Sequence, residues 1–77
     1  MNQQLFIIQK NSSILELGCG TGNLIGNLSP SYGIGVDISD EMVKIAENKY
    51  PRIKFVCKDV EEFLIKILKI RRLKLQL

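Results

Sequence analysis

The sequence predicts an α/β fold in which a parallel sheet of three or four strands is covered by helices on both faces, giving three layers. Three short apolar runs indicate the strands, at 14–17, 34–38 and 53–57. Turn-forming residues bound these runs, as is typical of strands buried in a parallel sheet. The segments between them have helical features, and alternating strands and helices imply right-handed crossovers between parallel strands.

The first two helices are indicated by their boundary residues. One is expected over 23–28, directly after a glycine cluster and before Pro30. Ser39 is placed to cap the next, whose first turn holds Asp40 and Glu41, where the helix dipole favours negative charge. Pro51 is expected to end that helix.

The two ends of the chain are less regular. Apolar residues from Val60 to Leu68 have helical spacing, and 73–77 alternate like a half-buried strand that could supply a fourth strand. Residues 5–8 are compatible with either a helix or a strand.

Size and composition limit the classes of protein. The chain has 77 residues, 45% hydrophobic and 25% charged, which fits one small folded domain and argues against disorder. It has no signal-peptide pattern and no apolar stretch of the roughly 18 residues that a membrane span needs. Two distant cysteines and no histidine leave no metal constellation and exclude Ser-His-Asp and Cys-His catalysis within this chain. We therefore expect a reduced, cytoplasmic protein with no membrane partner and no metal.

The C-terminal part is basic, with six Lys and Arg against three acidic residues over 58–77. Such a tail can bind nucleic acid or an anionic surface. No aromatic residue follows Phe63 to stack on bases, and ordinary helices expose lysines. We favour a solvated helix over a nucleic-acid partner.

The glycine cluster Gly18-Cys19-Gly20-Thr21-Gly22 follows the first strand and precedes a helix. Glycines in such a turn admit positive φ and let a ligand approach the backbone. The dinucleotide fingerprint Gly-x-Gly-x-x-Gly needs a glycine where Asn23 stands, which leaves a nicotinamide-dependent oxidoreductase as a minor alternative. The phosphate-binding loop is excluded because no lysine follows the glycines. Asp37 and Asp59 end the next two strands, so both are expected beside this loop.

The combination resembles class I, Rossmann-like, S-adenosylmethionine (SAM) dependent methyltransferases. The segment 14–22, Ile-Leu-Glu-Leu-Gly-Cys-Gly-Thr-Gly, is similar to their first motif. The segment 35–42 resembles their second-strand motif, and 55–59 resembles the third, with Lys58-Asp59 where the family usually has Gly-Asp. The resemblance covers about 13–62 and implies a single partial domain over 1–77, the N-terminal cofactor-binding half of the family fold.

The resemblance implies SAM as the cofactor and gives a role to each matching residue. Gly18, Gly20 and Gly22 would admit the methionine and ribose portions, with Cys19 and Thr21 between them in the loop. Glu16 would orient the loop or, through water, the ammonium group. Asp37 would accept hydrogen bonds from both ribose hydroxyls. The adenine would meet three further residues, by packing on Ile38 and by hydrogen bonding to Asp59, with Val60 alongside.

Each role has a structural alternative. Glu16 could be a loop acid, Asp37 and Asp59 could cap the helices that follow them, and Cys19 could fill a slot for a small residue. Met42 is better explained as helix core than as a ligand contact.

Nothing in the sequence matches the family's fourth strand or identifies a methyl acceptor or a catalytic residue. The first strand would then have an open edge, which invites self-association. Three functions remain: a methyltransferase fragment, a SAM-binding module without catalysis, and an assembly partner.

Overall fold

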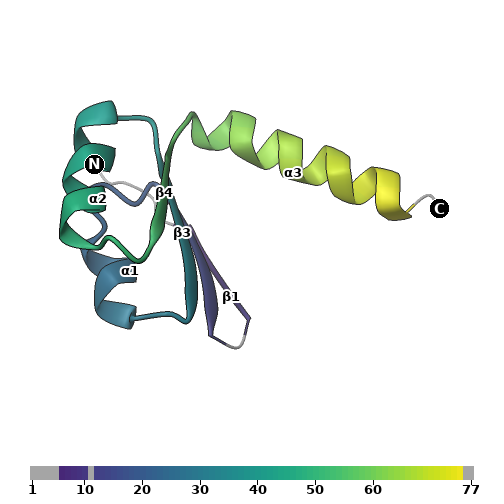
Figure 1. The fold of residues 1–77 in the computed structure, drawn as a ribbon. Coiled ribbons are helices and arrows are strands. Elements are labelled where there is room, and N and C mark those ends of the chain that lie inside the picture. The colour runs from purple at the N-terminus through teal and green to yellow at the C-terminus, as the bar shows by residue number, and fades with distance from the viewer. Residues whose placement is uncertain (1–5, 11, 76–77) are drawn as a thin grey trace.

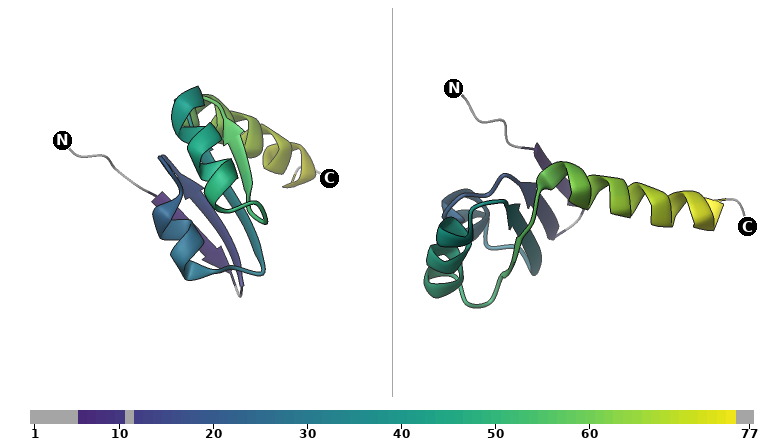
Figure 2. Two further views of the ribbon diagram at one scale, coloured as in Figure 1. Left: turned by 60° about the vertical axis from the view of Figure 1, so that its left-hand side comes forward. Right: turned by 90° about the horizontal axis from the view of Figure 1, so that it is seen from above.

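The computed structural model describes residues 6–10 and 12–75, which form one sheet with helices on both faces (Figure 1). Two short helices, α1 and α2, cover one face, and a longer helix, α3, starts beside the other and extends past the sheet (Figure 2). The α/β class and the helix-covered parallel sheet predicted from the sequence are therefore confirmed. The elements in chain order are β1 Phe6–Lys10, β2 Ser13–Leu17, α1 Asn23–Leu28, β3 Tyr32–Asp37, α2 Asp40–Lys49, β4 Lys54–Cys57 and α3 Val60–Leu75.

The three strands predicted from apolar runs are the parallel part of the sheet. β2 pairs in parallel with β3, and β3 with β4, in the order β2-β3-β4. Leu17 lies opposite Val36, and Asp37 opposite Cys57, so all three strands end at the same edge. The loops that follow the three strands are thereby brought together at that edge.

Of the segment 5–8, for which a helix and a strand were both open, residues 6–8 belong to the strand β1, and residue 5 lies outside the described residues. The β1 strand runs antiparallel to β2 along its whole length, from Phe6 opposite Leu17 to Lys10 opposite Ser13. The expectation that β2 would have an open edge is therefore wrong, because β1 occupies that edge. The backbone groups of β2 pair with strands on both sides, which removes the reason for self-association at this position.

The side of the sheet that faces α1 and α2 holds the core cluster. Ile25 of α1 and Ala46 of α2 are fully buried there, and Phe55 of β4 is almost so. Ser39 accepts a hydrogen bond from the Met42 backbone N–H at 3.2 Å, and this confirms it as the cap of α2. The α2 helix ends at Lys49, as the proline at 51 predicted.

The opposite face is covered less completely by α3. This helix continues to Leu75, so the strand predicted at 73–77 is wrong for 73–75, and residues 76–77 lie outside the described residues. The alternating pattern was misleading because a strand needs a neighbouring strand for its hydrogen bonds, whereas a helix satisfies its own. Within the described ranges, no helix is long and apolar enough to cross a membrane.

Candidate cofactor-binding site

The glycine loop leaves β2 in a tight turn held by backbone hydrogen bonds. Gly18, Gly20 and Gly22 all have positive φ, at 81°, 58° and 81°. The backbone N–H groups of Gly18 and Cys19 both donate to the Val36 carbonyl, at 2.7 and 2.9 Å. These bonds bind the loop to the carboxyl end of β3, the neighbouring strand. The conformation explains the glycines, because L-residues with a Cβ rarely adopt positive φ.

The glycines at 20 and 22 serve different purposes. A Cβ at Gly20 would meet nothing within 4 Å, so open space lies above this part of the loop. A Cβ at Gly22 would lie 2.9 Å from the Phe55 ring and 3.1 Å from the Ala46 side chain. Gly22 therefore allows the loop to pack closely on the core, while Gly20 leaves room for a ligand.

Asp37 ends β3 and is held directly against the glycine loop. Its Oδ2 accepts a hydrogen bond from the Gly20 backbone N–H at 3.0 Å, and its Oδ1 accepts one from Ser39 at 3.3 Å. The Asp37 carbonyl accepts a further bond from the Lys58 backbone N–H at 2.9 Å, which connects the ends of β3 and β4. Asp37 therefore joins all three loops at this edge, and its side chain remains half-buried.

Asp59 lies in the loop after β4 and caps α3. Its Oδ1 accepts hydrogen bonds from the backbone N–H groups of Glu61, at 2.7 Å, and Glu62, at 3.3 Å. The capping alternative for Asp59 is thus realised, which leaves Oδ2 for other partners. Val60 is half-buried beside it, as is Thr21 in the glycine loop, whereas Ile38 is 65% exposed. An exposed isoleucine at the end of a strand offers an apolar surface for a flat ligand.

Glu16 is the buried acid of the site. Its side chain is 1% exposed and points from β2 toward the face covered by α1. Its Oε1 has no hydrogen-bond partner among the described residues. Burial raises the pKa of the Glu16 carboxyl, and a hydrogen bond from the Ile25 backbone opposes this shift. Glu16 therefore lies inside the molecule, next to the glycine loop, whereas an ordinary acidic residue of a loop is exposed to solvent.

Cys19 is a core residue, since its side chain is 7% exposed and belongs to the cluster on the α1 and α2 face. Burial raises the pKa of the Cys19 thiol to about 12, and the nearby carboxylates of Asp37 and Glu16 add to the shift. A thiol with this pKa stays protonated at neutral pH and is a poor nucleophile. The side chain fills a small internal space, and its thiol donates a hydrogen bond to the Gly20 carbonyl of the loop at 3.6 Å.

Sequence reasoning missed the importance of Gly35 in the middle of β3. A Cβ at this position would lie 2.8 Å from the Phe55 ring and 2.9 Å from the Cys19 sulfur. Because residue 35 has no side chain, the Phe55 ring and the Cys19 side chain of the glycine loop can both approach β3 closely. An isolated glycine inside a strand is the available signal, because it marks a close approach of another group.

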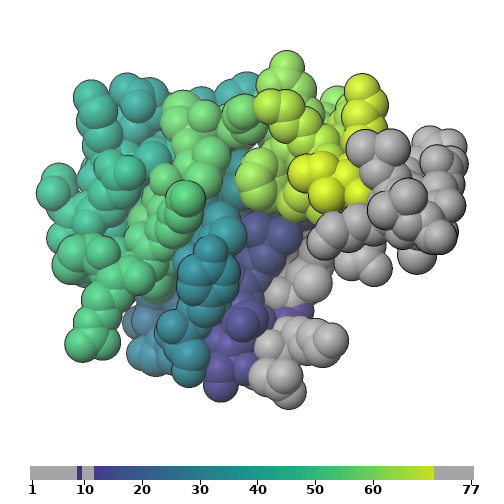
Figure 3. Space-filling view, turned by 45° about the vertical axis from the view of Figure 1, so that its right-hand side comes forward, coloured from purple at the N-terminus to yellow at the C-terminus, as the bar shows by residue number. Residues whose placement is uncertain are grey.

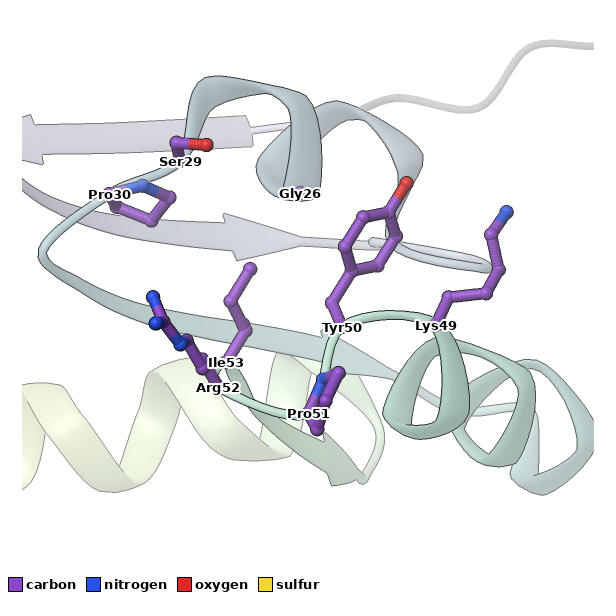
Figure 4. Close-up of a pocket in the computed structure, with 8 residues that line it drawn as sticks. All are labelled: Gly26, Ser29, Pro30, Lys49, Tyr50, Pro51, Arg52 and Ile53. Carbon is purple, nitrogen blue, oxygen red and sulfur yellow. The ribbon is translucent and has the colours of Figure 1, made fainter.

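A cavity of about 310 Å³ lies at the other edge of the sheet (Figure 4). Pro30 and Ile53, which line it, come just before β3 and β4, so the cavity is at the amino ends of the strands. Its basic residue Lys49 bonds to Asn23 Oδ1, and the Tyr50 hydroxyl donates to the same oxygen at 3.2 Å. None of the predicted site residues lines this cavity, and its polar side chains connect α1 to α2.

The arrangement at the carboxyl edge is typical of α/β proteins in which a ligand binds beyond the carboxyl ends of parallel strands. Residues 14–68 match the family model described as a methyltransferase domain, and the chain belongs to this family. The resemblance to class I methyltransferases found in the sequence is therefore confirmed.

Individual relatives are methyltransferases as well. The chain is 37% identical over 59 residues to malonyl-[acyl-carrier protein] O-methyltransferase of Priestia megaterium, covering 69% of this chain and 22% of that protein. It is 37% identical over 51 residues to demethylmenaquinone methyltransferase of Chlorobaculum tepidum, covering 62% and 21%. A putative methyltransferase 235L of Invertebrate iridescent virus 6 is 29% identical over 58 residues, covering 70% and 22%. The chain thus spans about one fifth of the length of these curated relatives.

Proposed function

We propose that this chain is the SAM-binding part of a methyltransferase, one partial domain over 1–77, and that it acts in the cytoplasm. The observation that carries the proposal is the convergence of three strand ends, where the Asp37 carboxylate is hydrogen bonded to Gly20 in the glycine loop. Both cysteines are free, which agrees with a reducing compartment.

The residues present fit such a cofactor. Nothing lies within 4 Å of the position that a Cβ would take at Gly20, so the methionine and ribose portions would approach the loop backbone there. Asp37 uses one lone pair of each oxygen on Gly20 and Ser39, and a carboxylate has about four acceptor sites, so two remain for the ribose hydroxyls. The exposed Ile38 would pack on the adenine, and the free oxygen of Asp59 would accept from its amino group.

The remaining predicted residues act on the loop itself. Gly18 and Gly22 give the backbone its shape, and Thr21, Cys19 and Val60 border the bound cofactor. Glu16, buried behind the loop, would hold it in place and reach the ammonium group through water. When bound, SAM supplies an electrophilic methyl group on its sulfonium. The chain's own part is to bind and orient the cofactor, and no residue is proposed here as catalytic.

The proposal can be tested by calorimetric titration of the full 77-residue chain with SAM. We expect binding that weakens by about 10- to 100-fold in Asp37→Ala, because hydrogen bonds to a charged group contribute about 1.5–3 kcal/mol each. Asp40→Ala is the matched control, since Asp40 lies three residues away and makes only an exposed ion pair with Lys44. We expect its affinity for SAM to stay within about twofold.

The result also separates the alternatives. Absence of SAM binding by the chain would overturn the cofactor assignment and favour an assembly role. Binding that is equally weakened by both substitutions would place SAM elsewhere. A SAM-binding module without catalysis is the second candidate. It predicts SAM binding without methyl transfer in the longest natural form of the protein, and methyl transfer measured there would exclude it.

A further inference from the structure

The α3 helix has two apolar faces, and the sheet covers one of them. Phe63 and Ile67 are half-buried on the inner face and line an apolar groove of about 220 Å³ with Leu15 and Ile34 of the sheet. Because α3 and the strands line the same groove, this side of α3 is turned toward β2 and β3. The other sides of the helix are therefore turned away from the sheet.

The outer face carries a second apolar stripe. Ile65 is 50% exposed and Leu68 is 59% exposed. With Glu61 they follow the spacing i, i+4, i+7, which places them on one side of a helix. At 3.6 residues per turn this stripe lies about 150° around the helix from the inner face. In the space-filling view α3 stands at the surface beside β2 and β3 (Figure 3).

The charges on α3 change sign along the helix. Glu61 and Glu62 lie in the first turn, Lys66 lies between the two apolar residues of the stripe, and Lys69 follows the second of them. The sequence stays basic beyond Lys69, with Arg71, Arg72 and Lys74. An acidic end and a basic end flank an apolar centre. Such a surface is complementary to a copy of itself turned end for end.

We propose that the outer face of α3 binds a second copy of this chain, with the two helices antiparallel about a two-fold axis near residues 66–67. In this register Ile65 packs on Leu68 of the second copy, and Glu62 lies beside Lys69 of the second copy. The symmetry repeats each contact twice, as in any isologous dimer. A parallel pair would instead bring acid beside acid and base beside base, which is unfavourable.

The apolar centre of the contact is small, so the dimer is weak. An interface below about 1,200 Å² in total belongs to the transient class, and we expect a dissociation constant between about 10 µM and 1 mM. The stripe lies on α3, on the opposite side of the sheet from α1 and α2 (Figure 1). Dimerisation is therefore independent of the proposed SAM site, and Asp37→Ala leaves it unchanged.

Sedimentation velocity of the full chain over a concentration series tests the proposal. We expect the mass to rise from monomer to dimer across that range, and Ile65→Lys to keep the chain monomeric throughout. Ile45→Lys on α2 is the matched control, because Ile45 is 41% exposed on a different helix, and it should dimerise as the parent does. Circular dichroism of each variant establishes that the fold is retained.

A charge swap tests the antiparallel register. Glu62→Lys and Lys69→Glu each place like charges together at two positions, and each should raise the dissociation constant by roughly tenfold. The double variant E62K/K69E restores opposite charges and should recover the parent value within about threefold.

Three results would overturn the proposal or its antiparallel arrangement. A chain that stays monomeric up to about 1 mM would leave the stripe to a partner of other chemistry. A dimer that persists in Ile65→Lys would place the interface elsewhere. Failure of the double variant to recover would overturn the antiparallel arrangement.

Discussion

The two faces of this sheet are covered very differently. On the α1 and α2 face, Ile25 and Ala46 are fully buried. The ring of Phe55, on β4, fits against β3 because residue 35 of β3 is glycine. On the α3 face, the helix leaves an apolar groove beside Leu15 and carries exposed isoleucine and leucine. The closely packed face is the one that supports the glycine loop. The closest packing therefore lies under the candidate ligand site, where it would keep the loop rigid. The other face is packed less closely and carries the proposed dimer contact.

The largest expected effect tests this difference directly. Ile25→Ala should lower the free energy of unfolding by about 3 kcal/mol, because it removes a fully buried side chain from a packed core. The comparison is Ile70→Ala on α3, which is 57% exposed and lies outside the proposed dimer contact, with an expected loss below about 0.5 kcal/mol. Urea unfolding at low protein concentration gives both values. Similar losses in the two variants would contradict the contrast between the faces.

A second, smaller effect concerns Gly35. Gly35→Ala should destabilise the fold by about 2 kcal/mol, because the added methyl meets the Phe55 ring and the Cys19 sulfur at less than 3.0 Å. Replacing the ring by a smaller side chain, in the double variant Gly35→Ala with Phe55→Leu, should recover part of that loss of stability. Thermal unfolding followed by circular dichroism measures both. An alanine that is accepted without loss would mean that the ring is free to move aside.

The smallest effect is a pH dependence from Glu16. Burial raises the pKa of the Glu16 carboxyl in the folded chain. The contribution of Glu16 to the free energy of unfolding is therefore most favourable below its ordinary pKa of 4.5, and it falls as pH rises through the pKa of the folded chain. Glu16→Gln removes the buried charge and should stabilise the chain by about 1 kcal/mol at pH 7. The gain should disappear at pH 4, where both side chains are neutral. Melting temperatures at the two pH values test this, and a gain that is equal at both would exclude the charge as its cause.

Much of the fold followed from local features of the sequence. The apolar runs ending at Leu17, Asp37 and Cys57 gave the parallel strands, and Ser39 gave the start of α2. The strand β1 could not be predicted, because its pairing with β2 depends on contacts between segments rather than on its own composition. The end of α3 was misassigned for a related reason. Its alternating leucines fit a strand only if a neighbouring strand is available.

The candidate site was predictable in position but not in its internal contacts. The glycines, Asp37 and Asp59 were expected at one edge of the sheet, and the structure places them there. That Glu16 is wholly buried, and that Gly22 packs on Phe55, depends on how α1 and α2 fold back over the loop. Which of these residues touch SAM stays a prediction.

The hydrogen bond between Asp37 and Gly20 has a consequence for how a ligand would arrive. The curved shape of the loop is set by the chain's own hydrogen bonds, since β3 holds the loop at both its start and its middle. Little conformational entropy is then lost on binding, which normally costs about 0.5–1.5 kcal/mol for each side chain or loop group that becomes ordered. Association would proceed as a single step on a prepared surface, with no slow rearrangement before the complex forms.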